Sequence, residues 1–185
     1  MITQGKTMTV YNILICFLVL ILGINQVLAD STSSLYRLGP GDKIRIQVFG
    51  EPDLSVETIV GDNGVISYPF LGEIRLKGIT ASFLENMITR RLKGPYLVNP
   101  IVTVSILEYR PVYVNGEVAK PGGFPFRPGL TVRKAISLAG GFAERANKDR
   151  ITVIRESYSR TISQPISLDS EVNPGDIITV ERSFF

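Results

Sequence analysis

The stretch Gly39-Pro40-Gly41-Asp42, followed by Lys43-Ile44-Arg45-Ile46, has a near copy close to the other end of the chain, Asn173-Pro174-Gly175-Asp176 followed by Ile177-Ile178-Thr179-Val180. Proline presets the dihedral φ for the second position of a tight turn, and glycine tolerates the positive φ that a type II turn requires next. β-favouring residues follow, so each copy predicts a turn that begins a strand. Because the copies lie far apart, we expect two small β-rich modules in series rather than one enzyme core.

The aspartates of these motifs have a structural and a metal-binding interpretation. Asp42 and Asp176 can each cap their turn through the side chain. A metal site needs several converging oxygen ligands, and nothing else in the sequence indicates such a set. We therefore assign a structural role in the turns to Gly39, Pro40, Gly41, Asp42, Pro174, Gly175 and Asp176.

The first 29 residues have the layout of a secretory signal peptide. Lys6 precedes an apolar run over residues 13–24, and Val27-Leu28-Ala29 places short side chains ahead of Asp30. This run is shorter than the roughly twenty residues that a membrane-spanning helix needs. We expect export with cleavage after Ala29, and a flexible polar lead-in over residues 30–35. The alternative is an uncleaved membrane anchor formed by residues 10–28.

The residue types that are missing narrow the function classes. The only cysteine, Cys16, lies inside the leader, so the mature chain has no disulfide, no thiolate nucleophile and no lipid-bearing cysteine at the cleavage point. Histidine is absent, which removes the usual general base and the commonest transition-metal ligand. The 20 Lys and Arg residues exceed the 17 Asp and Glu residues by too little to indicate nucleic acid.

In the first module the hydrophobic pattern predicts strands and one helix. Apolar residues alternate from Lys43 to Val48, as in a half-buried strand. Residues 57–60 and 65–68 flank Asp62-Asn63-Gly64, which predicts a hairpin. Helical spacing predicts a helix over about residues 80–93, capped by Thr80 or by Ser82, with Glu85 completing a capping box with Ser82. Residues 101–107 are apolar on both faces, which is typical of a central strand.

The second module repeats this mixture of strands and one helix. Thr131 is a good N-cap for a helix that ends at Gly140-Gly141. Further strands are predicted at residues 112–114, 150–155, 160–168 and 177–181. We therefore predict an α+β fold class with two small β-rich modules, the first over residues 36–109 and the second over residues 110–185.

The ordered set of these motifs resembles a known family. The residues that carry the resemblance in the first module are Tyr36-Arg37-Leu38-Gly39-Pro40-Gly41-Asp42, Asp62-Asn63-Gly64, Tyr68-Pro69, Leu71-Gly72, Gly78, Asn99-Pro100 and Val102-Thr103-Val104. They are similar to the polysaccharide export domain of outer-membrane polysaccharide export proteins. Those in the second are Val114-Asn115-Gly116-Glu117-Val118, Pro121-Gly122, Ala135-Ile136, Ala139-Gly140-Gly141 and Pro174-Gly175-Asp176. They are similar to the soluble-ligand-binding β-grasp (SLBB) module of the same proteins.

The resemblance implies a non-enzymatic, periplasmic component of capsular polysaccharide or exopolysaccharide export. Family members form homo-oligomeric rings around a channel and dock against an inner-membrane polysaccharide copolymerase. Larger members carry an N-terminal lipid on cysteine and a C-terminal helix that forms the outer-membrane pore. This sequence matches a short form without that helix, so the resemblance implies association with the outer membrane through a separate β-barrel partner. The alternative function is a monomeric carbohydrate-binding or envelope-scaffolding module.

Several side chains are candidates for contact with glycan or with neighbouring subunits. The cations are Arg90, Arg91, Lys93, Arg127, Arg133 and Lys134, and the terminal aromatics are Phe184 and Phe185. For the two aromatics, a contact with a partner and an anchor at a membrane interface are the alternatives. For the cations, the alternative is a solvated helix face. Tyr109, Tyr113, Phe124 and Phe126 can stack on sugars, although burial of about half of them is the simpler expectation.

Catalysis and cofactor binding are not indicated. Glu51, Asp53 and Glu57 are close in sequence, and a pair of carboxylates is what glycoside hydrolysis requires, but around Pro52 a solvated turn is the simpler interpretation. The clusters Gly122-Gly123 and Gly140-Gly141 lack the spacing of a phosphate-binding loop. We therefore expect no catalytic residues, no metal and no cofactor.

Overall fold

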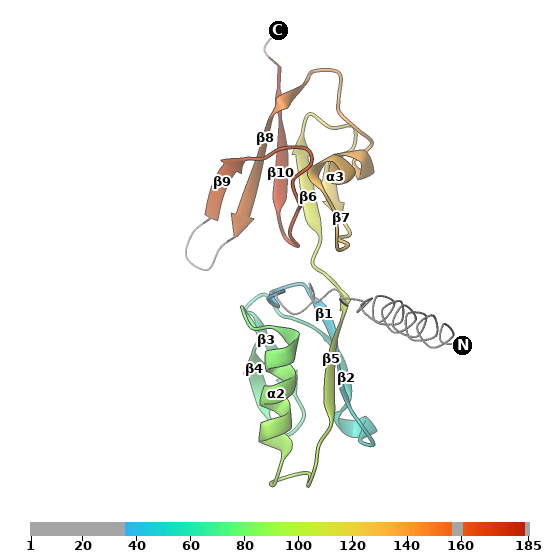
Figure 1. The fold of residues 1–185 in the computed structure, drawn as a ribbon, viewed down its shortest axis with the longest axis vertical. Coiled ribbons are helices and arrows are strands. Elements are labelled where there is room, and N and C mark those ends of the chain that lie inside the picture. The colour runs from blue at the N-terminus through green and yellow to red at the C-terminus, as the bar shows by residue number, and fades with distance from the viewer. Residues whose placement is uncertain (1–35, 157–160, 184–185) are drawn as a thin grey trace, which may run out of the picture. The chain divides into compact units, whose positions relative to one another are not determined.

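The structure, a computed structural model, describes residues 36–156 and 161–183 (Figure 1). Its buried apolar residues form two separate cores, one built from residues between Leu38 and Val104 and the other from residues between Val112 and Val180. We call the elements around the first core the first module and those around the second core the second module. The predicted α+β class with two small β-rich modules is confirmed. The predicted signal peptide and lead-in lie outside the described residues.

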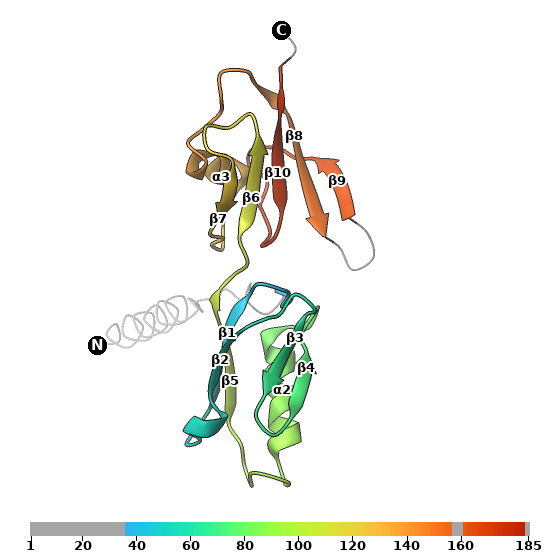
Figure 2. The same ribbon diagram turned by 180° about the vertical axis from the view of Figure 1, so that it is seen from behind.

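An antiparallel sheet forms one layer of the first module. Its strand order is β2 (Val56–Ile59), β1 (Lys43–Val48), β5 (Val102–Glu108). Along β1 the buried residues Ile44, Ile46 and Val48 alternate with outward-facing ones, as the period of two predicts. Helix α2 (Ala81–Leu92) and the hairpin of β3 (Val65–Tyr68) and β4 (Gly72–Arg75) lie on the same side of this sheet in both ribbon views (Figures 1 and 2).

The predicted hairpin between residues 57–60 and 65–68 is wrong. Strand β2 pairs with β1, whereas β3 pairs with β4. The physical reason lies at Val60, whose N–H donates to the carbonyl of Asp42 and whose carbonyl accepts from the N–H of Gly41. The residue that follows β2 is therefore hydrogen-bonded to the first Pro-Gly-Asp corner and not to β3. Asn63 and Gly64 still form a tight turn, but that turn leads the chain out of this sheet.

The prediction that residues 101–107 form a central strand is also wrong, because β5 is an edge of its sheet. One edge of β5 pairs with β1. No further strand pairs with its other edge among the described residues, and α2 packs against β5 in the core. The carboxylate oxygen Oε1 of Glu85 on α2 accepts the N–H of Val104 at 2.9 Å. Only Val104 of β5 is buried, and Val102 and Ile106 are half-buried against the same core, so β5 has one core-facing side rather than two.

The cap of α2 resolves the choice between Thr80 and Ser82. Thr80 is the N-cap, and its hydroxyl accepts the N–H of Phe83 at 3.2 Å. The expected capping box of Ser82 and Glu85 is wrong, since Glu85 is bound to Val104 instead. Buried Leu84, Ile88 and Leu92 form the core face at helical spacing.

The second module is a five-stranded sheet with a short helix. Its strand order is β7 (Gly122–Phe124), β6 (Val112–Gly116), β10 (Ile177–Arg182), β8 (Ala146–Glu156), β9 (Thr161–Pro165). Strand β10 runs parallel to β6, and the other pairs are antiparallel. Helix α3 (Val132–Leu138), capped by Thr131 as predicted, packs its buried residues into the core of this module. In residues 36–156 and 161–183 no helix has the length and hydrophobicity needed to cross a bilayer.

Candidate functional site

The first Pro-Gly-Asp corner is built around the carboxylate of Asp42, which is fully buried. Its Oδ2 accepts the N–H of Gly39 at 2.8 Å, and both carboxylate oxygens lie 2.8 Å from the hydroxyl oxygen of Tyr36. Burial, followed by the nearby negative charge of Asp42, raises the pKa of Tyr36 far above the usual 10, so this hydroxyl keeps the proton that it donates. The buried charge is thus satisfied by several donors, as a buried carboxylate requires.

The second corner repeats the turn bond but differs in its cation. Asp176, also buried, accepts the N–H of Asn173 at Oδ2 at 2.8 Å, which matches the bond from Gly39 to Asp42. Arg155 on β8 donates from Nε to Oδ1 at 2.9 Å and from Nη2 to Oδ2 at 2.6 Å. The hydrogen bond to Asp176 raises the pKa of Arg155. This pair is the bidentate arginine–carboxylate geometry, and it lies within the second module.

The two corners meet at Arg110, which leads into β6. The N–H of Arg110 donates to Oδ1 of Asp42 at 2.9 Å, and its Nη1 lies 3.5 Å from Oδ2. Its Nε donates to the carbonyl of Pro174 at 3.1 Å. One side chain therefore contacts both copies of the repeated motif, which the sequence alone did not indicate.

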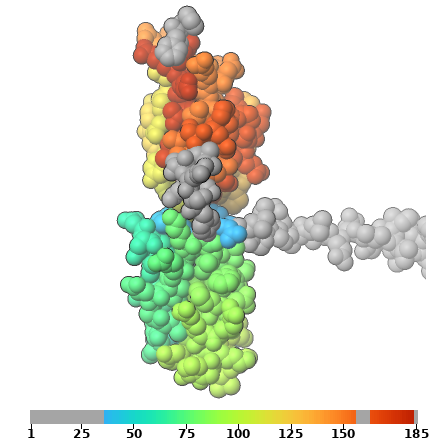
Figure 3. Space-filling model, turned by 90° about the vertical axis from the view of Figure 1, so that its left-hand side faces the viewer, coloured from blue at the N-terminus to red at the C-terminus, as the bar shows by residue number. Residues whose placement is uncertain are grey.

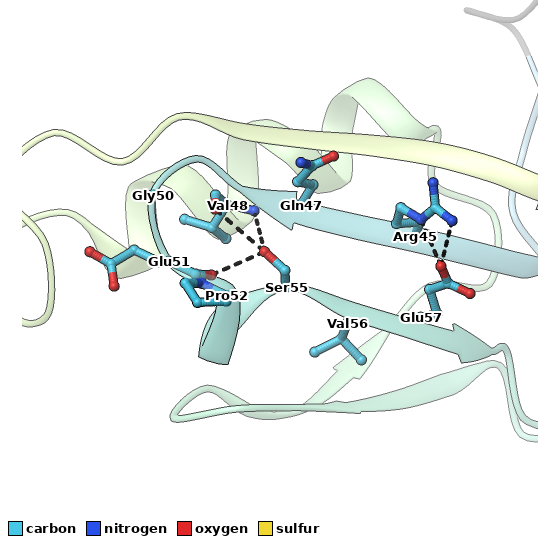
Figure 4. Close-up of a pocket in the computed structure, with 9 residues that line it drawn as sticks. All are labelled: Arg45, Gln47, Val48, Gly50, Glu51, Pro52, Ser55, Val56 and Glu57. Atoms are coloured by element: carbon cyan, nitrogen blue, oxygen red, sulfur yellow. Dashed lines mark hydrogen bonds and ion pairs between the residues drawn. The ribbon is translucent and has the colours of Figure 1, made fainter.

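The acidic residues considered for glycoside hydrolysis lie near an open pocket lined by residues of β1, of β2 and of the segment between them (Figure 4). Glu51 and Glu57 line it, whereas Asp53 does not. Glu57 is bound by Arg45, whose Nε donates to Oε1 at 2.7 Å. The hydroxyl of Ser55 is bound to the backbone of Val48 and of Glu51. Among the described residues no group of three or more His, Cys, Asp or Glu side chains is arranged to hold a metal.

The predicted contact cations are exposed but do not form one group. Arg90 and Arg91 lie in the last turn of α2, and Lys93 follows them. The chain around this helix is coloured green to yellow-green in Figure 3. Arg127 lies in the loop before α3, in the second module. On α3, Arg133 is paired with Asp169 at 2.9 Å, and Nζ of Lys134 donates to the carbonyl of Gly129. Phe184 and Phe185 lie outside the described residues.

The aromatic candidates differ in exposure. Tyr109, Phe124 and Phe126 are half-buried, whereas Tyr113 is exposed. The ring of Tyr109 contacts both Tyr36 and Phe126, with centroid distances of 5.0 and 5.3 Å. Among these four aromatic residues, only Tyr113 is exposed enough for its ring to stack on a sugar.

A group of exposed apolar side chains in the first module was not predicted. Its members lie on three loops, after β1, between β3 and β4, and between α2 and β5, and we call them the loop patch: Phe49, Phe70, Tyr96, Val98 and Ile101. The rings of Phe70 and Tyr96 lie 5.3 Å apart, and the N–H of Phe49 donates to the carbonyl of Ile101. Phe49 is 77% exposed and Val98 is 91% exposed. The sequence signal that was overlooked is the occurrence of large apolar residues at turn positions next to Gly50, Pro69 and Pro100.

Phe70 is held in an unusual backbone conformation. Its φ is +60°, a region that non-glycine residues rarely occupy. The hydroxyl of Tyr96 lies 3.4 Å from the carbonyl of Phe70, so the same residue contacts its ring and its backbone. Backbone strain of this kind is found most often at functional sites.

Comparison with known proteins assigns the family. The family model described as polysaccharide biosynthesis/export protein matches residues 30–107, and the SLBB domain model matches residues 111–162. The exopolysaccharide production protein ExoF of Rhizobium meliloti is 35% identical over 146 residues. The chain belongs to the outer-membrane polysaccharide export family. Both matched domains are those that the sequence motifs resembled.

Two further members of this family show how far the similarity extends. The EPS I polysaccharide export outer membrane protein EpsA of Ralstonia solanacearum is 29% identical over 85% of this chain. The polysialic acid transport protein KpsD of Escherichia coli is 32% identical over 53% of this chain. The alignment with ExoF covers 70% of this chain and 35% of that protein, and those with EpsA and KpsD cover 50% and 19% of theirs. The chain therefore spans half or less of the length of these relatives.

Proposed function

We propose that this chain is a non-enzymatic component of capsular polysaccharide or exopolysaccharide export across a bacterial envelope. The observation that carries the proposal is the succession of an export domain and an SLBB domain on one chain, as matched by the two family models. The names of the relatives agree with it, since they refer to exopolysaccharide production, polysaccharide export and polysialic acid transport. In this proposal the chain contributes surfaces and shape to transport, and its partners supply the energy.

The finer proposal is a homo-oligomeric ring in the periplasm, associated with the outer membrane and reached through a cleaved signal peptide. The ring would serve as a conduit between an inner-membrane copolymerase and the outer membrane. The loop patch supports this proposal, because large exposed apolar groups on a protein surface mark protein contacts. We assign the loop patch to the copolymerase, and Arg90, Arg91, Lys93 and Arg127 to glycan or subunit contacts. Phe184 and Phe185 are proposed as a further subunit contact.

Deletion of the gene and native mass determination test this function together. Deletion is expected to abolish secreted or surface glycan, and the wild-type gene supplied in trans is expected to restore it. The protein extracted in mild detergent is expected to have the mass of a closed oligomer and to bring the copolymerase with it.

The opposite outcomes point to other functions. Normal glycan secretion after deletion would overturn the export role. A monomer that binds glycan without partners would favour the alternative of a carbohydrate-binding module. Cleavage of purified polysaccharide by the protein would overturn the non-enzymatic assignment.

A further inference from the structure

Three glycines make room for the side chain of Arg110 between the two corners. A Cβ added at Gly175 would lie 2.7 Å from Nε of Arg110, and one at Gly41 would lie 3.3 Å from its Cβ. Both glycines have positive φ, so their turns require glycine in any case. Gly39 differs, because its φ is not in the left-handed region and a Cβ there would collide with Nη1 of Arg110. The three atoms nearest to that position all belong to Arg110, which accounts for the missing side chain at Gly39.

Aromatic contacts continue beside this arginine. The Tyr36 ring meets Tyr109 edge to face, Tyr109 meets Phe126 in the same way, and the guanidinium carbon of Arg110 lies 5.8 Å from the Tyr36 ring centroid. Tyr36 precedes the first corner, whereas Phe126 packs against the core of the second module. Polar and aromatic contacts thus both join the two modules around residues 109–111.

The two aspartates differ in which module supplies their arginine. Asp176 is paired with Arg155 of its own module, so its charge is balanced locally. Asp42 is paired with Arg110, which comes from the segment that leads into the second module. The corner of the first module is therefore completed by a residue that also binds the carbonyl of Pro174. Neither corner can move away from the other without breaking a bond of Arg110.

We propose that Arg110 is a positioning residue that locks the two modules into one rigid unit. Its N–H and Nη1 hold Asp42, its Nε holds Pro174, and Gly39 provides the space that the guanidinium occupies. This inference goes beyond the proposed export function, because it concerns the mechanics of a single chain and does not depend on the cargo or the partner. A conduit built from many copies requires such a unit, since each copy must present both modules in the same orientation.

Distance measurement between spin labels tests the lock directly. The full chain, with Cys16→Ser, carries labels at Glu73→Cys on β4 and at Glu144→Cys before β8, both exposed positions. Dilution with unlabelled protein removes distances between chains. The unmodified background is expected to give one narrow distance distribution, and Arg110→Met is expected to broaden it at least twofold. Arg110→Lys is expected to broaden it as well, because lysine keeps the charge but lacks the planar fork.

Arg155→Met is the matched control, since it removes the arginine from the other corner within one module. It is expected to lower stability but to leave the distribution narrow. Gly39→Ala is expected to broaden the distribution by displacing the guanidinium, and to add nothing in the Arg110→Met background. Should Arg110→Met fail to fold, Gly39→Ala decides alone. Three results would overturn the proposal: a broad distance distribution in the background protein, a narrow one in folded Arg110→Met or Gly39→Ala, or equal broadening by Arg155→Met. These distances do not depend on export, so the lock can fail while the export function holds, and the reverse.

Discussion

At the scale of single residues, we expect the stability of the first corner to depend on the negative charge of the buried Asp42 carboxylate. Its two oxygens face the N–H groups of Gly39 and Arg110 and the hydroxyl of Tyr36. Asp42→Asn would replace one acceptor oxygen by an NH2 group that opposes these donors. We expect the free energy of unfolding to fall by about 2 kcal/mol, measured by urea denaturation.

Glu57→Gln is the control for that substitution, because Glu57 is half-exposed and paired on the surface with Arg45. Its expected cost is within about 0.5 kcal/mol. If the two substitutions cost the same, the first corner does not depend on its buried charge.

Tyr68 gives a prediction with a pH dependence. Its ring is buried and its hydroxyl donates to the carbonyl of Leu54 at 2.7 Å. Tyr68→Phe is therefore expected to cost about 1 kcal/mol at pH 7. Burial raises the pKa of Tyr68 from 10.0 to about 12, so the folded state favours the protonated form. The contribution of Tyr68 is fully present below pH 10 and is lost as the pH rises towards 12.

Urea denaturation of both proteins between pH 8 and pH 11 checks this sign. The advantage of tyrosine over phenylalanine is expected to stay constant up to about pH 10 and to shrink steadily between pH 10 and pH 11. An advantage that stays constant over this range would mean that the hydroxyl is exposed to solvent.

At the scale of elements, the contact between α2 and the edge of β5 predicts a local effect. Glu85→Ala removes the acceptor of the Val104 N–H and is expected to cost about 1 kcal/mol. Hydrogen exchange at the Val104 amide is expected to accelerate, while exchange at Ile46 on central β1 is unchanged. Glu85→Gln keeps an acceptor oxygen and serves as the control. Equal exchange in all three proteins would show that the helix does not protect this edge.

The elements also show what the sequence can and cannot predict. Strand β1 and helices α2 and α3 were predicted because their signals, alternation, helical spacing and threonine caps, come from residues that are neighbours in the chain. The pairing partners of β2 and β5 were not predicted, because strand pairing depends on segments that meet only after folding. Val60 is bound to the first corner, and β5 is covered by a helix rather than by a strand.

At the scale of the whole molecule, the same limit applies to the candidate sites. The two Pro-Gly-Asp motifs were evident as a repeat, but Arg110 stands outside both and is recognised only when its contacts with Asp42 and Pro174 are seen together. The loop patch was overlooked for the same reason. Its members come from three loops, and hydrophobic patterns assign isolated apolar residues at turns to the core rather than to the surface.

The loop patch leads to a prediction that separates folding from partner binding. Phe49, Val98 and Ile101 are 77, 91 and 58% exposed, so replacing all three by serine removes little burial and is expected to change stability by less than about 1 kcal/mol. If this patch contacts the copolymerase, the triple variant is expected to fold and to lose both co-purification of that partner and glycan export. Leu138→Ser, at a 49% exposed position on α3 in the second module, is the control and is expected to retain both. Normal export by the folded triple variant would show that the loop patch is not a transport interface. Loss of export by Leu138→Ser as well would show that exposed apolar residues act through general stability instead.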